Sequence, residues 1–268
     1  MKGGHVKTSL LPRALAASGL GLLYAFLLLP LVAVVSASLT AGELMRVPPQ
    51  GLSLRWFVRF LESETFREAL LLSLQVALTT TCIVVTLATM AALCHRALSR
   101  RLGAAFRVAM TLPLLLPELL TAIGLLFFLN TIGLGKTLAG LQIGHVIIAY
   151  PFAFLAIVAA MEQVDPAMEE ASASLGAGGM ETFRRVILPL AKPGMLTGGL
   201  FAFIVSFDMF TISLLLKPIG GNTLPLALFD FLTYDFDPTA AAAATLSVIF
   251  AVLGVLAIER AVGLRQAF

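Results

Sequence analysis

The sequence predicts an all-α membrane protein with six transmembrane helices, on the grounds of its composition, the lengths of its apolar segments and the placement of its charges. Hydrophobic residues make up 59% of the 268 positions and charged residues only 12%. A chain of this composition cannot bury its apolar surface inside one soluble globule, so membrane lipid must solvate much of it. The net charge of +3 is small, and we expect no nucleic-acid partner.

Six stretches are long enough to cross a hydrocarbon core, which needs about 20 mostly apolar residues. They cover residues 14–39, 69–94, 108–129, 141–161, 195–216 and 240–258. The first stretch is too long for the apolar core of a secretory signal, so we expect it to remain as a membrane helix. The sequence therefore divides into an N-terminal segment 1–13, a six-helix domain 14–262 and a tail 263–268.

The basic residues indicate how the chain is oriented, because Lys and Arg in short loops favour the cytoplasmic side. An even number of spans places both termini on one side, and 12 of the 18 basic residues lie on that side. The other six are Arg46, Arg55, Arg59, Arg67, Lys136 and Lys217. We therefore predict that both termini are cytoplasmic.

The first outer loop, residues 40–68, combines Pro48-Pro49 with Trp56, Phe57 and Phe60 among alternating charges. This pattern predicts a turn followed by an amphipathic helix at the membrane interface. The helix either faces an extracytoplasmic partner or caps the bundle.

The inner loop, residues 162–194, is a polar, helix-forming island between two apolar segments. Asp165 is suited to cap a short helix that begins at Pro166, and Gly176 is suited to end it in a left-handed conformation. A second helix is expected from about residue 180 to 190, after which Lys192-Pro193-Gly194 is expected to turn the chain back into the membrane. The two helices would make a rigid lever.

The same loop resembles the element by which membrane subunits of ATP-binding-cassette importers dock into their ATPase. That family pattern is Glu-Ala-Ala, three residues, Gly, nine residues, then Ile-x-Leu-Pro, and Glu170-Ala171, Gly176 and Leu188-Pro189 fall in register with it. The resemblance extends over about residues 52–260, which look like inner-membrane permeases of the spermidine/putrescine type. The chain departs from the pattern at four places. Ser172 replaces the second Ala, and Val186 replaces the Ile. Gly178-Gly179 stands where the family usually has Ser-Pro, and Asp208-Met209 stands where many members have Asp-Glu.

This resemblance implies a type I importer permease fold with a cytoplasmic coupling helix, in a bacterial inner membrane. It further implies two copies of a cytoplasmic ATPase that carries ATP and Mg, a second related permease subunit and an extracytoplasmic solute-binding protein. The chain itself would have no catalytic residue, cofactor or metal. The residues that the resemblance assigns to the ATPase contact are Glu169, Glu170, Ala171, Gly176, Leu188 and Pro189.

The solute is expected to be a polyamine, with an opine, an amino-acid-like compound, iron or thiamine as alternatives. Two ionisable residues inside predicted spans, Glu118 and Asp208, are candidates for the translocation path, because a charge there costs about 2.5–3.5 kcal/mol to insert. Pro113 and Pro117 are expected to kink the helix at Glu118, and Thr211 is expected on the helical face of Asp208. Alternatively, each carboxylate satisfies a neighbouring helix.

Other chemistries lack the residues they need. The histidines at positions 5, 95 and 145 show no metal-ligand spacing, and the segment 130–137 has Asn130 where a phosphate-binding loop needs its first glycine. Two alternatives to an importer stay open: a proton-driven secondary carrier that uses Glu118 and Asp208, for which inverted repeats are missing, and a membrane scaffold without a solute path.

Overall fold

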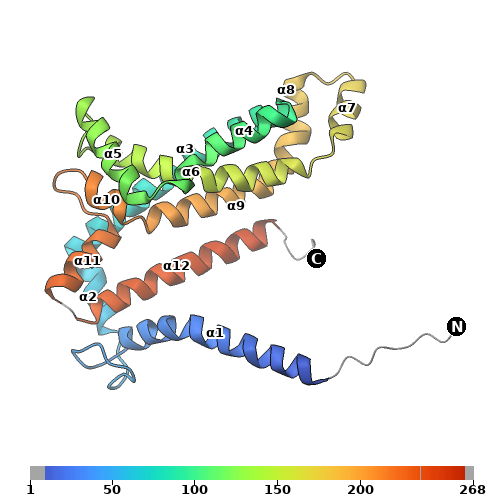
Figure 1. Cartoon of the computed structure of the whole chain (residues 1–268). Helices are drawn as coiled ribbons and strands as arrows, with labels where there is room; N and C mark the ends of the chain where they lie inside the picture. The colour runs from blue at the N-terminus through green and yellow to red at the C-terminus, as the bar shows by residue number, and fades with distance from the viewer. Residues whose placement is uncertain (1–9, 236, 263–268) are drawn as a thin grey trace. The chain divides into compact units, whose positions relative to one another are not determined.

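The computed structural model describes residues 10–235 and 237–262, and almost all of its regular structure is helical (Figure 1). The predicted terminal segments fall largely outside it: residues 1–9 and 263–268 are not among the described residues. The elements are α1 (Leu10–Ser38), α2 (Arg55–Glu62), α3 (Glu64–Ala97), α4 (Arg100–Thr111), η1 (Leu112–Leu115), α5 (Glu118–Thr131), α6 (Leu138–Glu162), α7 (Pro166–Ser174), α8 (Gly179–Thr182), η2 (Phe183–Ile187), α9 (Leu188–Phe207), α10 (Thr211–Leu216), α11 (Leu224–Tyr234) and α12 (Thr239–Val262). The chain divides into a first unit, residues 1–62 with 234–247, and a second unit, residues 63–233 with 248–268.

The long helices agree with the predicted spans. Five described segments are long and apolar enough to cross a membrane: Ala17–Ser38, Glu64–Ala97, Leu138–Glu162, Gly179–Phe207 and Thr239–Leu256. A sixth is reached only if Arg100–Leu115 and Glu118–Thr131, which meet at an angle of 94°, are counted as one broken span. Large apolar side chains such as Phe26, Leu29 and Phe127 are exposed, as expected of helices that lipid surrounds.

The bend in the third predicted span, at residues 116–117, confirms the expected proline kink. Leu116 adopts an extended conformation with ψ of 138°, and Pro117 precedes the first residue of α5. A proline lacks a backbone N–H and disfavours a helical conformation in the residue before it. The segment therefore divides into a short 3₁₀ turn and a new helix.

The predicted turn at Lys192-Pro193-Gly194 is wrong, because α9 continues straight through these residues with Pro193 inside it. The helix is entered through the π-helical turn η2, Phe183–Ile187. Ala191 and Gly194 are buried, and a Cβ on Gly194 would lie 2.9 Å from the carbonyl oxygen of Ala156 in α6. Close packing of α9 on α6 thus outweighs the local preference of Pro and Gly for a turn.

The fifth predicted span also ends earlier than expected. α9 stops at Phe207, and α10 begins at Thr211. Asp208 and Thr211 therefore do not share one helical face, and that prediction is wrong. Met209, between them, is buried in an apolar cluster with Ile212 and Leu216, so burial of this side chain accompanies the break.

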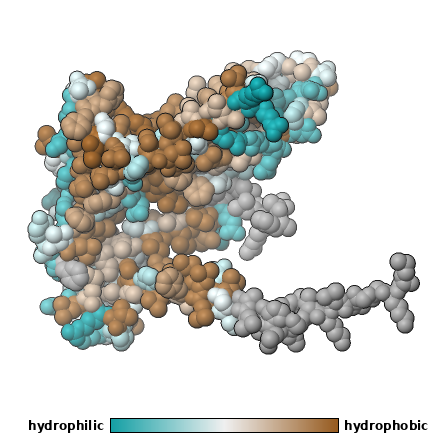
Figure 2. Space-filling model, viewed as in Figure 1, coloured by the Kyte–Doolittle hydropathy of each residue, from teal (hydrophilic) through white to brown (hydrophobic). Residues whose placement is uncertain are grey.

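Small side chains allow the three central helices of the second unit, α3, α6 and α9, to pack closely. The core there contains Ala88, Ala92, Ala149 and Ala153 around Phe154. Membrane helices associate through such small residues, because apolar side chains gain little by leaving lipid for a partner helix. At one end of these helices lie α7 and α8, and at the other lie α5 and α10 (Figure 1). Hydrophilic residues gather at the end with α7 and α8 (Figure 2).

The first unit contains the predicted amphipathic helix as α2. Trp56 and Phe60 are buried, and the Trp56 indole N–H donates to the carbonyl oxygen of Thr40 at 2.8 Å. The guanidinium of Arg55 stacks 4.2 Å from the Trp56 ring, and Arg59 forms a 2.8 Å ion pair with Asp237. These contacts hold α2 within the first unit, and both interpretations of the outer loop stay predictions.

Candidate functional site

The short helix α7 has the ends that the sequence predicted. The Asp165 carboxylate accepts a 2.9 Å hydrogen bond from the Ala167 backbone N–H, and Pro166 is the first helical residue. Gly176 has φ of +87°, and its N–H donates to Ala173 at 2.9 Å. Because an L side chain avoids this left-handed conformation, the glycine is required where the helix ends.

A second helical segment, α8 with η2, follows α7 closely. The hydroxyl oxygens of Ser172 and Thr182 lie 3.0 Å apart and connect the two segments. A groove of about 510 Å³ lies between them. Its lining residues are Met168, Ala171, Ser172, Leu175, Gly176, Ala177, Glu181, Arg185 and Val186. The groove combines small residues with exposed apolar ones. The small residues leave room for another protein to come close to the backbone of α7 and α8.

The two predicted glutamates of α7 have different surroundings. Glu169 is half-buried and forms an ion pair with Arg96 of α3, whereas Glu170 is exposed. Ala171 and Gly176 are exposed as well, while Leu188 and Pro189 lie in the first turn of α9 rather than in a loop. Of the predicted coupling residues, Glu170, Ala171, Gly176 and Pro189 are exposed, and the first three lie in or directly after α7.

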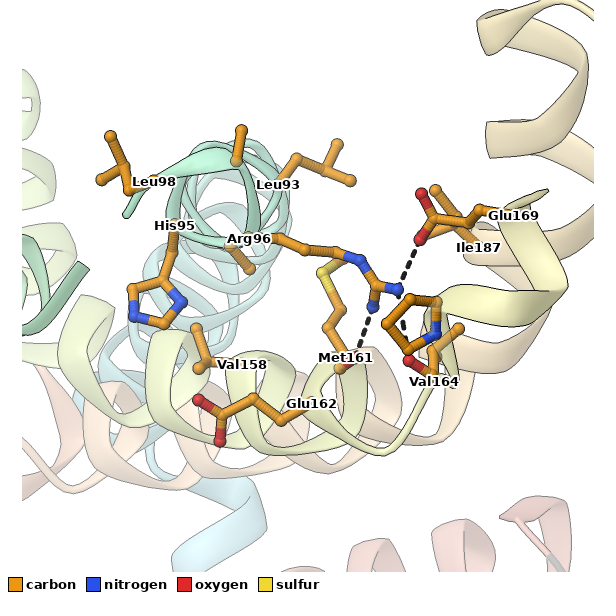
Figure 3. Close-up of a pocket in the computed structure, with 13 residues that line it drawn as sticks. Leu93, His95, Arg96, Leu98, Val158, Met161, Glu162, Val164, Glu169 and Ile187 are labelled. Atoms are coloured by element: carbon orange, nitrogen blue, oxygen red, sulfur yellow. Dashed lines mark hydrogen bonds and ion pairs between the residues drawn. The ribbon is translucent and has the colours of Figure 1, made fainter. Parts of the chain in front are cut away.

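Arg96 is a functional candidate that the sequence does not reveal, since on sequence alone it is one of several basic residues on the cytoplasmic side. Its guanidinium donates to the carbonyl oxygens of Met161 at 2.6 Å and Val164 at 3.2 Å, and it pairs with Glu169 (Figure 3). It lines a cavity of about 620 Å³ bounded by the ends of α3 and α6 and the start of α7. Nothing in the sequence indicates which carboxylate faces this arginine, because the pair is 73 residues apart along the chain.

The predicted path residues lie at helix breaks. Glu118 is the first residue of α5 and is exposed, Asp208 follows the last residue of α9 and is exposed, and Thr211 begins α10 and is half-buried. Within residues 10–235 and 237–262, neither carboxylate has an ion pair or a side-chain hydrogen bond, so no partner helix of the described chain satisfies them. The two carboxylates belong to different breaks, one before α5 and one after α9.

His145 is a second residue whose place the sequence did not indicate. It is 1% exposed, and its Nδ1 and Nε2 lie 2.8 Å from Ser206 Oγ and 3.2 Å from Ser213 Oγ. Ser213 also donates to the carbonyl oxygen of Met209 at 2.7 Å. The histidine thus joins α6 to both helices beside the break at residues 208–210. Among the described residues no group of three or more His, Cys, Asp or Glu side chains is placed to hold a metal ion.

Long apolar helices that carry a short capped helix at one end are the architecture of a multi-pass membrane protein. Residues 84–265 match the model of the family described as binding-protein-dependent transport system inner membrane component, and the chain belongs to this family. It is therefore a permease subunit of the ATP-binding-cassette importer class, located in an inner membrane, as the resemblance implied. Membership sets aside the stand-alone carrier and the scaffold.

Two curated relatives and one solved structure illustrate the similarity. The chain is 27% identical over 231 residues to the spermidine/putrescine transport system permease protein PotC of Haemophilus influenzae, covering 84% of this chain and 88% of the relative. It is 28% identical over 230 residues to the putrescine transport system permease protein PotI of Escherichia coli, covering 83% and 82%. A chain of a bacterial ABC transporter involved in the import of the acidic polysaccharide alginate superimposes with a TM-score of 0.65 at 18% identity, covering 98% of this chain and 99% of that one. The last similarity supports the fold.

Proposed function

We propose that this chain forms half of the translocation path of an importer for a polyamine such as spermidine or putrescine, together with a second, related permease subunit. The observation that carries the proposal is the capped α7–α8 element, whose exposed Glu170, Ala171 and Gly176 stand in register with the coupling pattern of the family. The polyamine is supported by the names of the two curated relatives, which refer to spermidine and putrescine.

The partners follow from this assignment. Two copies of a cytoplasmic ATPase bind ATP and Mg, and an extracytoplasmic binding protein delivers the solute, so this chain performs no bond chemistry and holds no cofactor. Both termini face the cytoplasm, in agreement with the bias of basic residues toward that side. The end of the second unit with α7 and α8 then faces the ATPase.

The α7–α8 element suits a mechanical contact. Glu170 offers a charge for a basic residue of the ATPase, Ala171 and Gly176 permit close approach, and the exposed Leu175 and Met180 supply apolar area. Leu188 and Pro189 begin the long helix α9, so a force on α8 passes directly into a span. A stiff element is required here because a flexible linker would absorb the movement.

The solute path uses Glu118, Asp208 and Thr211. An exposed carboxylate at a helix break can replace part of the hydration of a passing ammonium group, and the breaks supply backbone carbonyls that are not engaged in a helix. With Met209 after Asp208, the path has one acidic charge fewer there than many permeases of this type.

Transport proceeds by alternating access. The loaded binding protein docks, the two ATPases close on ATP, and the coupling helices move so that the path opens outward; hydrolysis then returns it to the inward state. For this cycle, closure of the ATPases must favour the outward state by several kcal/mol, since about 5.5 kcal/mol moves an equilibrium from 1:99 to 99:1.

Co-purification tests the assembly. The tagged chain is purified from its native membrane in mild detergent, and the wild type is compared with Glu170→Lys and with the control Glu62→Lys, which alters an exposed glutamate of α2. We expect an ATPase and a second permease with the wild type and the control, and less ATPase with Glu170→Lys. A wild-type chain that purifies alone contradicts the proposal.

Transport into proteoliposomes tests the solute. The reconstituted complex is supplied with labelled putrescine, spermidine, thiamine, iron or an opine, each with its binding protein. We expect ATP-dependent uptake of a polyamine, and a reduction with Glu118→Gln or Asp208→Asn. Uptake that needs a proton gradient rather than ATP contradicts the mechanism, and uptake of another solute contradicts the polyamine assignment.

A further inference from the structure

Arg96 joins three segments of the second unit at the point where the predicted coupling helix leaves the membrane domain. It lies in the last turn of α3. It donates to the carbonyl oxygen of Met161 at the end of α6 and to that of Val164 in the connection between α6 and α7, and it pairs with Glu169 in α7 (Figure 3). The side chains of Arg96 and Glu169 are 21% and 33% exposed, so water screens this ion pair less than one on the open surface.

The chemistry of the three acceptors explains why an arginine stands there. The last carbonyl groups of a helix have no partner inside the helix and carry the negative end of its dipole. Met161 supplies such a carbonyl, and Val164 supplies a second one in the connection that follows. A planar guanidinium, with five N–H donors in a fixed fork, can bind two carbonyls and a carboxylate at the same time. A lysine ammonium is a single point charge and does not reproduce this geometry.

The position of the Arg96 contact allows it to set the direction of α7. Between α6, which ends at Glu162, and α7, which begins at Pro166, the chain contains only three residues. This connection joins α7 to α6 but makes no contact with α3 through its covalent bonds. Glu169 lies one turn into α7, so its ion pair with Arg96 fixes the direction of α7 relative to α3 as well as to α6. The helices α3 and α6 themselves pack together, because Ala88 and Ala92 of α3 and Phe154 of α6 belong to one core cluster.

We propose that Arg96 is a positioning residue that fastens the coupling helix α7 to two spans at once, so that a displacement of α7 moves α3 together with α6. The proposal rests on the proposed function of α7. It assigns different roles to two neighbouring glutamates: Glu170 faces the ATPase, and Glu169 holds α7 to its own subunit. Loss of the Arg96 contact then leaves the ATPase bound but weakens the transfer of its movement.

The test measures solute transported per ATP hydrolysed by the complete importer in proteoliposomes, for Arg96→Gln, Arg96→Lys and Glu169→Gln. Arg107 and Glu162 provide the matched control, because they also pair at this end of α6 but are 39% and 53% exposed. We expect Arg96→Gln and Glu169→Gln to lower the ratio at least about fivefold, the low end of typical coupling between two sites. Arg96→Lys should be intermediate, and Arg107→Gln should match the wild type.

Further readouts separate this role from a general loss of structure. ATPase retained on purification should be unchanged in all these variants, and the double variant Arg96→Gln with Glu169→Gln should be no worse than Arg96→Gln alone. If Arg96→Gln does not fold, the result for Glu169→Gln decides whether the ion pair couples α7 to the spans, because this variant keeps the arginine and both of its carbonyl hydrogen bonds. A ratio that stays at the wild-type value, or falls equally in Arg107→Gln, overturns the role of Arg96. A wild-type chain that retains no ATPase overturns the proposed function instead, and this inference with it.

Discussion

Replacing Gly198 by alanine should destabilise the membrane domain, because α9 and α6 touch at this glycine. A Cβ at position 198 would lie 2.9 Å from the Cα of Ala153, 3.0 Å from its carbonyl oxygen and 3.3 Å from its Cβ. Carbon atoms pack best at about 3.5–4.0 Å. Two of the three obstructing atoms belong to the backbone of α6, so no side-chain rotation can make room and the helices must separate.

The size of the effect follows from two opposing terms. Forcing an additional methyl group into a closely packed core typically costs about 1–3 kcal/mol. Alanine in place of glycine in a helix recovers roughly 0.5–1 kcal/mol. We therefore expect Gly198→Ala to lose about 1 kcal/mol of stability, the difference between the centres of the two ranges.

Thermal unfolding of the purified protein in detergent measures this loss. Gly124→Ala in α5 is the matched control, because nothing lies within 4 Å of a Cβ at that position, and it should be as stable as the wild type or slightly more stable. Adding Ala153→Gly to Gly198→Ala should restore little, since it removes only the obstructing Cβ. A Gly198→Ala protein that melts with the wild type, or one that Ala153→Gly rescues fully, would refute the reasoning.

Three further predictions concern other parts of the chain. Gly176→Val should cost about 1–2 kcal/mol locally because valine avoids positive φ, and it should increase proteolysis of the α7–α8 segment. Gly178→Ala is the control and should not increase proteolysis, because nothing lies within 4 Å of its Cβ and its φ is −74°. Equal cleavage of the two variants would contradict the prediction. His145→Leu removes the contacts with two buried serine hydroxyls. It should lower the free energy of unfolding by about 1–3 kcal/mol and the melting temperature with it; an unchanged melting temperature would show that the network adds nothing. Trp56→Phe leaves the buried Thr40 carbonyl without its 2.8 Å donor and should lower the local stability by about 1–3 kcal/mol. Amide hydrogen exchange around α1 and α2 should then be faster than in the wild type, and identical exchange rates would contradict the prediction.

Much of the fold could be predicted because membrane helices are specified locally. A run of about 20 apolar residues satisfies its own backbone and must span the bilayer, so the spans could be located from hydropathy. The caps of α7 are also local: Asp165, Pro166 and Gly176 act on backbone groups within a few residues. The same holds for the kink at Pro117.

The corrections concern residues whose local preference competes with packing. Pro193 and Gly194 favour a turn, yet α9 runs through them because Gly194 is held against α6. The break after Asp208 has no strong breaker in its sequence, and it coincides with the burial of Met209 and the contacts of His145 with serines on both sides. These arrangements depend on helices that are far apart along the chain.

The sequence by itself therefore determined where the long apolar helices lie, the ends of α7 and the family pattern around Glu170, since each depends on residues close together in the chain. Only the tertiary structure decided that Glu169 turns inward to Arg96 while Glu170 stays exposed, and that His145 joins α6 to both sides of a helix break. A short-range pattern cannot express these facts, because a buried polar side chain is satisfied by whichever partner the packing of distant helices places beside it.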